Sequence, residues 1–381
     1  MSDHFPPGYI LFSRNSMATL RVIVASIAAF FGMLLTVPVV STWLLLWLVA
    51  YLTRKGARLF EPPIINYDQL IEFAPTLGWK PKPNLNAHYL TMVNDGVFHT
   101  ITDSQGWPSA GRLSDSNVVV FGDSYAFGYG VDARAAFWKC GNGVSIKSIG
   151  APGYNMVQEL LLMNQLAPQL SGKLVIWFIY FGNDLYDNLL PNNRFYRTPF
   201  VRKPPRSNVW EVTTQHVSPS TWPNQSAPQY YEKLAELSCA TFLSERAYSA
   251  CEFLIGEAVK TLRKVNARLM IMTIPDVVQI TPDGRLKLAK SAPDIDSFDA
   301  DLPDKKISEI AAKFGLSVVA LKNHLTVHDY KDRDPHWNER GHQRVAEIID
   351  RIWYEILQGN ESAQIEPYAI SPAKSPSFSL S

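Results

Sequence analysis

The chain has 381 residues, and its 36 Lys and Arg residues balance its 35 Asp and Glu residues to a formal net charge of +1. This length allows one catalytic domain of roughly 200 to 250 residues plus attachments, and so neutral a charge argues against a nucleic acid partner. The three cysteines lack the paired spacing of a zinc site or a disulfide framework, so we expect no metal and no cofactor.

The first predicted element is a membrane anchor over residues 19–53, which follows a short N-terminal tail at residues 1–18. Between Arg21 and Arg54 lie 32 residues without a formal charge, well beyond the roughly 18 apolar residues that indicate a spanning helix. No small-residue cleavage site follows this run, so we interpret it as a retained anchor and not as a signal peptide. Proline interrupts helical hydrogen bonding, so we expect a kink or a re-entrant bend near Pro38.

The orientation of this anchor is not fixed by its flanks, because basic residues stand on both sides of the apolar run. We favour a single kinked span that places the catalytic domain on the extracytoplasmic side of the membrane. A hairpin with both ends in the cytoplasm remains open. In both arrangements membrane lipid is the expected partner of residues 19–53, and a membrane partner subunit is a further candidate.

Residues 54–114 are polar and rich in turn-forming residues, which predicts an N-terminal extension of short strands and loops. A catalytic domain is predicted over residues 115–358, where short apolar runs alternate with amphipathic helical segments. Strands that are buried on both faces have this pattern, and it indicates a three-layer α/β/α fold around a five-stranded parallel sheet. The five runs end at Phe121, Ile149, Phe181, Ile274 and Leu321.

Three other segments complete the chain. Residues 187–229 and 276–304 are polar, and we expect them to be excursions over the working edge of the sheet. Residues 359–381 are rich in Ser and Pro, which predicts a disordered tail. Cys239 and Cys251 can pair in an oxidising compartment, but we interpret each as a buried thiol.

Candidate functional residues follow the ends of the predicted strands. Ser124, in VVVFGDSYAFGYGV, comes directly after the first strand at the expected start of a helix. The carboxyl ends of parallel strands carry the site in such folds, and free backbone amides at a helix start can stabilise an anion. A Gly-Asp-Ser turn is also a common way to end a strand, so this motif by itself is weak.

Two further motifs can supply hydrogen-bond donors. Gly150, in SIGAPGYN, ends the second strand, and its backbone amide can approach a ligand closely. Asn183, in YFGNDL, follows the third strand, and an Asn side-chain amide is a common oxyanion donor. Each has a simpler interpretation, since Gly150 can merely end a strand and Asn183 and Asp184 can merely cap the next helix.

A fourth motif, RDPHWNERGH, follows the fifth strand. A nucleophilic serine needs a base, and the base needs a carboxylate that fixes its tautomer. We expect His336 to be the base and Asp334 to orient it, in preference to Asp332. We interpret His342 as a packing or capping residue near a helix start and Trp337 as a wall of the site.

In this order the four motifs resemble those of the SGNH/GDSL hydrolase family, over about residues 115–358. The resemblance implies a flavodoxin-like SGNH fold with Ser124 as nucleophile and His336 with Asp334 as the acid–base pair. It also implies an oxyanion hole made by the Ser124 and Gly150 amides and the Asn183 side chain. The common family pattern places Asp three residues before His, where this chain has Arg333. The shorter spacing is similar to the DxHW motif of alginate O-acetyltransferases, which place it before the serine.

The expected function is therefore that of a membrane-anchored serine esterase, which acts on an O-acetyl group of a carbohydrate through an acyl-Ser124 intermediate. Two alternatives stay open. The same residues can move an acyl group onto a polysaccharide, or the chain can be a non-catalytic, membrane-tethered binding module. The choice of a carbohydrate ester depends on the family resemblance alone.

Overall fold

The computed structural model describes residues 21–27, 30, 43–51, 62–93, 95–108, 111–141, 143–193, 196–219 and 230–359. The chain divides into two compact units, Met1–Pro62 and Pro63–Ser381. In the first unit, residues 21–27 and 43–51 are helical. Within the described residues, no helix combines the length and the apolar character that crossing a bilayer requires. Much of the predicted anchor, with Pro38, and the predicted tail after Gly359 lie outside the described residues.

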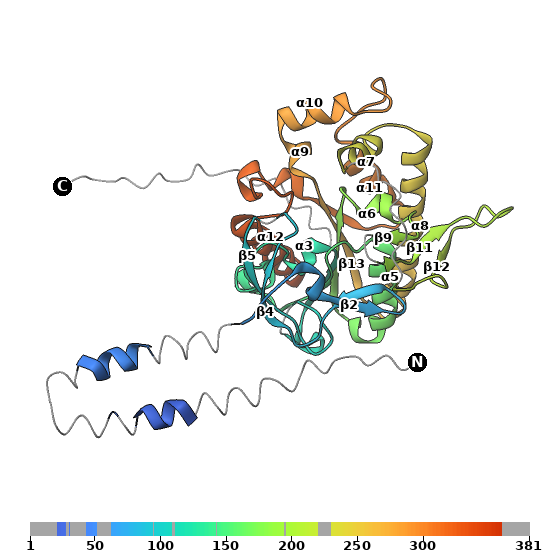
Figure 1. The fold of residues 1–381 in the computed structure, drawn as a ribbon. Coiled ribbons are helices and arrows are strands. Elements are labelled where there is room, and N and C mark those ends of the chain that lie inside the picture. Colours follow the sequence, from blue (N-terminus) through green and yellow to red (C-terminus); the bar gives the residue numbers. More distant parts are fainter. Residues whose placement is uncertain are drawn as a thin grey trace, which may run out of the picture. The chain divides into compact units, whose positions relative to one another are not determined.

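A five-stranded parallel sheet forms the centre of the second unit (Figure 1). Its strand order is β14-β13-β8-β6-β7, and every neighbouring pair is parallel. This is the doubly wound order in which the first strand lies between the second and the third. The sheet confirms all five predicted strands, and each ends within one residue of the predicted position. The strands are β6 (Val118–Gly122), β7 (Ile146–Gly150), β8 (Leu174–Tyr180), β13 (Arg268–Ile274) and β14 (Ser317–Ala320).

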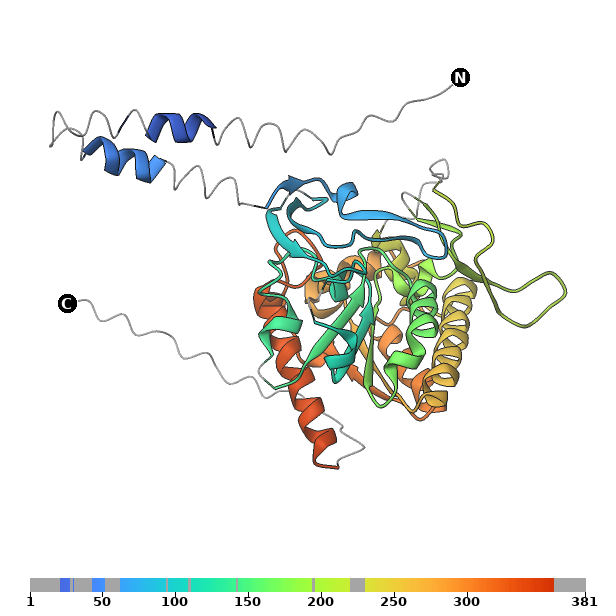
Figure 2. The same cartoon turned by 90° about the horizontal axis from the view of Figure 1, so that it is seen from below.

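Helices cover both faces of this sheet and give the predicted three layers. One face packs against α5 (Met156–Leu166), α8 (Phe242–Lys264) and α11 (Leu302–Lys313). The other face packs against α4 (Phe137–Cys140) and α12 (Glu339–Leu357). Figure 2 shows α12 in red on one side of the sheet, with α5 in green and α8 in yellow on the other. Successive residues of a strand alternate between the two cores, so strands buried on both faces read as unbroken apolar runs.

The N-terminal extension consists of short strands, as its composition predicts. It forms a sheet of order β1-β4-β5 and a separate β2-β3 hairpin. These strands are β1 (Ile64–Ile65), β2 (Ile71–Ala74), β3 (Gly78–Pro81), β4 (Asn86–Leu90) and β5 (Val97–Ile101), with 3-10 turns at Tyr67–Leu70 and Leu113–Asp115. The extension binds the catalytic part through the Trp79 indole, which donates to Pro152 O at 3.2 Å, and through the Tyr154 hydroxyl, which donates to Trp79 O at 2.7 Å.

The two polar segments after β8 and β13 differ from each other in structure. The first holds two antiparallel ribbons, β9 (Asn192–Asn193) with β10 (Tyr196–Arg197) and β11 (Phe200–Arg202) with β12 (Glu211–Thr213). The second, predicted only as an excursion, contains the helices α9 (Val277–Ile280) and α10 (Pro282–Lys290). The polar residue before each helix is its N-cap. Asp276 accepts a hydrogen bond from Val278 N, and Thr281 accepts one from Gly284 N.

The remaining short elements connect these layers. They are α3 (Ser124–Phe127), α6 (Asp184–Asp187), α7 (Tyr230–Leu237) and the 3-10 turns Ala167–Leu170, Leu321–Asn323 and Val327–Asp329. The cysteines Cys140, Cys239 and Cys251 are all free, and Cys239 and Cys251 are buried.

A buried ion pair joins the extension to strand β7. The Lys147 ammonium lies 2.6 Å from Asp103 Oδ2 and donates to Gly111 O at 2.8 Å. Only 2% of the Lys147 side chain is exposed, against 19% of Asp103. Replacement of this lysine by an apolar side chain would leave both oxygens without this donor, and an unsatisfied buried acceptor is costly.

We therefore expect Lys147→Met to lower the free energy of unfolding by about 1–3 kcal/mol. The control is Lys260→Met, which breaks the exposed Lys260–Glu257 pair and should change stability by less than about 1 kcal/mol. Urea titration followed by tryptophan fluorescence measures both. Equal effects of the two substitutions would contradict a structural role for the Lys147 pair.

His342 is buried near the start of α12. Its ring stacks parallel to that of Phe137, with centroids 6.0 Å apart, and its Nδ1 accepts a hydrogen bond from Phe137 N at 3.3 Å. Burial, with smaller repulsions from His336 and Lys331, lowers the pKa of His342 to about 3. These contacts make His342 a packing residue. None of its hydrogen bonds within the described residues is to Ser124.

The depressed pKa of His342 predicts a loss of stability in acid. The unfolded chain binds a proton on this ring below pH 6.5, whereas the folded chain does so only near pH 3. The contribution of His342 to the free energy of unfolding is therefore fully present above pH 6.5. Below that pH it falls by up to about 1.4 kcal/mol per pH unit. We expect His342→Asn to flatten the pH dependence of urea unfolding between pH 6.5 and 4. An unaltered slope in His342→Asn would contradict this assignment.

Candidate active site

Ser124 lies at the carboxyl end of β6, on the first residue of the short helix α3. Asp123 precedes it as the N-cap, and its side chain accepts a hydrogen bond from Tyr125 N at 3.0 Å. Gly122 allows close packing of the strand end against β8, because a Cβ there would come within 2.9 Å of the Phe178 side chain. The sequence therefore turns sharply at the point where the strand order of the sheet reverses.

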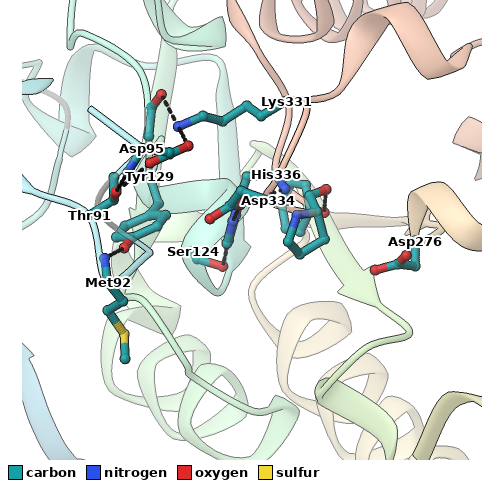
Figure 3. A network of polar contacts seen from close by, with 12 residues as sticks. Thr91, Met92, Asp95, Ser124, Tyr129, Asp276, Lys331, Asp334 and His336 are labelled. Carbon is teal, nitrogen blue, oxygen red and sulfur yellow. Dashed lines mark hydrogen bonds and ion pairs between the residues drawn. The ribbon is translucent and has the colours of Figure 1, made fainter. Parts of the chain in front are cut away.

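His336 and Asp334 meet Ser124 in one hydrogen-bonded chain (Figure 3). His336 Nε2 lies 2.7 Å from Ser124 Oγ, and His336 Nδ1 is hydrogen-bonded to Asp334 Oδ1. The same carboxylate oxygen accepts from the backbone N of His336 at 2.9 Å. With a proton on Nδ1, Nε2 has its lone pair directed at the serine hydroxyl. Asp332, the competing carboxylate, is exposed.

The electrostatics of the neighbouring carboxyl groups separate Asp334 from the others. Burial would raise the pKa of Asp334, but the hydrogen bonds and charge of His336 and the nearby Lys331 cation lower it below its ordinary value. Burial raises the pKa of Asp123, and it raises those of Glu159 and Asp184 further. Asp123 Oδ2 also lies 3.3 Å from Ser124 Oγ, but Asp334 is the carboxyl group that its surroundings keep ionised.

Gly150 ends β7 and Asn183 follows β8, the two strands that flank β6. A Cβ on Gly150 would come within 2.4 Å of Gly122 O and 3.0 Å of Asp123 O, so only glycine allows β7 this close to the serine turn. Asn183 makes no helix-capping hydrogen bond with its side chain. Its Nδ2 donates to Tyr154 O at 3.0 Å, and its amide helps to stabilise the Asp123 carboxylate. The amide therefore lies beside the serine turn and not on the helix end.

Asp184 is not the helix cap that the sequence predicts, because it is the first residue within α6. It is fully buried, and its carboxyl accepts a hydrogen bond from Tyr180 N at 2.7 Å, which closes the turn after β8. Glu159, also fully buried, accepts from the Trp177 indole at 2.5 Å. Repulsion among these carboxyl groups and Asp123 adds to the effect of burial on their pKa values. Burial therefore favours the neutral forms of Asp184 and Glu159.

Aromatic rings that the sequence interpretation did not single out surround His336. The ring centroids of Tyr125 and Tyr129 lie 5.0 Å and 4.8 Å from that of His336. The Tyr125 hydroxyl donates to Pro335 O at 2.6 Å, which fixes the residue before the base. Trp337, expected as a wall of the site, is fully buried and packs edge-on against Tyr125 at 4.7 Å. The repeated aromatics in YAFGYG after Ser124 were the available signal.

A second buried carboxyl, Asp276, follows β13 on the far side of these rings. Its Oδ2 accepts a hydrogen bond from the Tyr180 hydroxyl at 2.6 Å, and the Tyr180 ring lies 4.8 Å from that of Tyr125. Burial raises the pKa of Asp276 to about 7, with opposing contributions from His336 and Asp334. The sequence interpretation places this residue only at the start of the polar excursion over residues 276–304. Over the described part of the chain, no three His, Cys, Asp or Glu side chains are grouped so as to hold a metal ion.

Comparison with known proteins gives limited information. No protein-family model matches the chain, and no curated protein matches it. Among solved structures, it is similar to a putative arylesterase from Agrobacterium tumefaciens str. C58, with 14% identity, TM-score 0.38, and coverage of 63% of this chain and 98% of that one. A carbohydrate acetylesterase family member from Sinorhizobium meliloti gives 9% identity, TM-score 0.36, and coverage of 64% and 99%. A peptidoglycan O-acetylesterase gives 13%, 0.30, and 56% and 47%. Likenesses this slight carry no argument about activity, which has to come from the geometry of the site.

Proposed function

We propose that this protein is a serine esterase that hydrolyses its substrate through an acyl-Ser124 intermediate. The observation that carries the proposal is the hydrogen-bonded chain from Asp334 through His336 to Ser124 Oγ. A serine hydroxyl 2.7 Å from an imidazole nitrogen, whose other nitrogen is bound by a carboxylate, has the arrangement that activates a nucleophile. Its position at the carboxyl end of a parallel sheet is where such folds bind substrates.

The proposed reaction has two halves. His336 takes the proton of Ser124 as Oγ attacks the ester carbonyl, and Asp334 stabilises the imidazolium that forms. The tetrahedral oxyanion is bound by the Ser124 and Gly150 amides and by the Asn183 side chain. His336 then protonates the leaving alcohol, which leaves the acyl group on Ser124. A water molecule gives its proton to His336 and attacks the acyl carbonyl, and the proton returns to Ser124 as the acid departs.

The substrate class and the location are narrower parts of the same proposal. An O-acetyl group on a carbohydrate is proposed because the four motifs resemble those of SGNH hydrolases. Attachment to membrane lipid through residues 19–53 is proposed because of the 32 uncharged residues, and a single kinked span with the site on the extracytoplasmic side is the arrangement that we favour. A membrane partner subunit is the remaining candidate for this segment.

Acyl transfer to a polysaccharide hydroxyl is the second candidate, and the spacing of Asp334 and His336 favours it. This spacing is similar to that in polysaccharide O-acetyltransferases, and the aromatic rings packed around His336 reduce the space for water beside the base. In that reaction the sugar hydroxyl replaces water in the second half and gives its proton to His336. The groups that form the acyl-enzyme are the same.

The nucleophile and base can be tested with p-nitrophenyl acetate. Ser124→Ala and His336→Ala should each lower kcat/KM by on the order of 10³-fold or more, and Asp334→Asn by about 10²- to 10⁴-fold. The matched control is Asp332→Asn, which alters the exposed neighbouring carboxylate and should stay within about twofold of the parent enzyme. Full activity of folded Ser124→Ala would overturn the proposal. Failure of a fluorophosphonate probe to label Ser124 in the folded protein would instead support a non-catalytic binding module.

Hydrolysis and transfer can be separated by the fate of the acyl group. We expect the enzyme, given an acetyl donor and oligosaccharides, to release acetate at a rate that the oligosaccharide does not change, without acetylated sugar in the mass spectrum. Accumulation of acetylated sugar, absent with Ser124→Ala, would assign the transferase reaction.

A further inference from the structure

The loop that carries His336 is closed by a short antiparallel bridge between Tyr330 and Trp337. Inside it, Lys331 N donates to His336 O at 3.0 Å, so Lys331 lies directly opposite the proposed base. The Lys331 side chain leaves this loop and donates to Gly130 O at 3.1 Å. Its ammonium also lies 2.6 Å from Asp95 Oδ2 and 4.2 Å from the ring centre of Phe98.

This ion pair is shielded from water, since only 11% of each of the Lys331 and Asp95 side chains is exposed. Asp95 belongs to the connection between β4 and β5 in the N-terminal extension. Its other carboxylate oxygen accepts from the Thr91 hydroxyl, and its backbone N donates to Thr91 Oγ1 at 3.1 Å. Asp95 is thus held in place before it meets the lysine. We refer to Thr91, Met92 and Asp95 as the β4–β5 turn.

The same extension holds the segment after Ser124. The Tyr89 hydroxyl accepts a hydrogen bond from Gly130 N at 2.6 Å, and the Tyr129 hydroxyl accepts from Met92 N at 2.6 Å. Tyr129 N in turn donates to Ser124 O at 3.0 Å. Gly130 has a φ of +81°, and a Cβ there would come within 2.7 Å of Lys331 Nζ, so a glycine is required where the lysine passes.

Two segments far apart in sequence, the β4–β5 turn with Asp95 and the segment after Ser124 with Gly130, therefore meet at the Lys331 ammonium. Figure 3 shows Lys331 and Asp95 beside Ser124 and His336. We propose that Lys331 and Asp95 are positioning residues, through which the β4–β5 turn of the extension fixes the Ser124 and His336 loops at reacting distance. This inference rests on the proposed function, because it assumes that Ser124 and His336 react. It makes the extension a part of the active site and not merely an attachment to it.

Two physical effects give the ion pair this role. Removal of one partner of a shielded pair leaves the other charge without compensation, so the loops must rearrange to solvate it. A displacement of about 1 Å between nucleophile and base can lower a rate by about 10²-fold. Loss of either partner should thus displace the Ser124 and His336 loops relative to each other.

The test compares Asp95→Asn, Lys331→Met and the double variant in the full-length enzyme. Methionine keeps an unbranched apolar stem over Phe98, and asparagine keeps the shape of the aspartate. Each single variant should lower kcat/KM for p-nitrophenyl acetate, and the rate of fluorophosphonate labelling at Ser124, by about 10- to 100-fold. The double variant should be no slower than the slower single variant, since both break the same interaction.

The division of the effect between kcat and KM distinguishes positioning from a general structural role. Lys331→Met and Asp95→Asn should each lower kcat and leave KM within about twofold, because the pair contacts the loops of Ser124 and His336 and not the substrate. The control is Lys313→Met, which breaks the exposed 2.7 Å pair with Glu252 and should leave kcat and KM unchanged. Urea unfolding shows that each variant is folded.

The outcomes separate this inference from the proposed function. Parent-like kcat/KM and labelling in folded Asp95→Asn, or strictly additive losses in the double variant, would overturn the positioning role while Ser124→Ala remained inactive. Full activity of Ser124→Ala would overturn the function itself. If Asp95→Asn does not fold, Tyr129→Phe provides the second measurement. It removes the hydroxyl that accepts from Met92 N, by which the β4–β5 turn holds the segment after Ser124, and should slow labelling several-fold. An unchanged labelling rate would again contradict the proposal.

Discussion

Parallel pairing of the five strands is the constraint on which the site depends. Because all five strands run in one direction, the segments that follow β6, β7 and β8 leave the sheet at the same edge. Ser124, Gly150 and Asn183 are the residues at or just beyond those strand ends. Their spacing in sequence is irrelevant to their proximity in space, since the register of the sheet sets it. The helices bury both faces of the sheet and form one hydrophobic core on each face.

The sequence therefore predicts the sheet and the order of the motifs well, because a strand buried on both faces leaves an unbroken apolar run. It cannot predict contacts between charged side chains of separate segments. Lys331 and Asp95 are ordinary charged residues in the chain, and only the fold brings them within 2.6 Å. The helices α9 and α10 were missed for a related reason, since their amphipathic faces are short and their caps resemble loop residues.

Charge is distributed around the serine in a way that composition cannot reveal. Burial raises the pKa values of Asp123, Glu159 and Asp184. Asp334 is also buried, yet His336 and Lys331 lower its pKa. The carboxyl group whose surroundings favour the ionised form is therefore the one that is bonded to the imidazole, and an ionised carboxylate at this place suits the orientation of a base.

The two-residue spacing between Asp334 and His336 has a local physical basis. A carboxylate placed two residues before an amide can accept from that backbone N–H, as Asx turns do, and Asp334 accepts from both the backbone and the ring of His336. The bridge between Tyr330 and Trp337 holds the rest of the loop, and the Tyr125 hydroxyl fixes Pro335 between the two residues. At this spacing Asp334 and His336 orient each other within a single turn. The turn by itself does not set the distance between His336 and Ser124. The ion pair of Lys331 with Asp95 of the extension sets that distance.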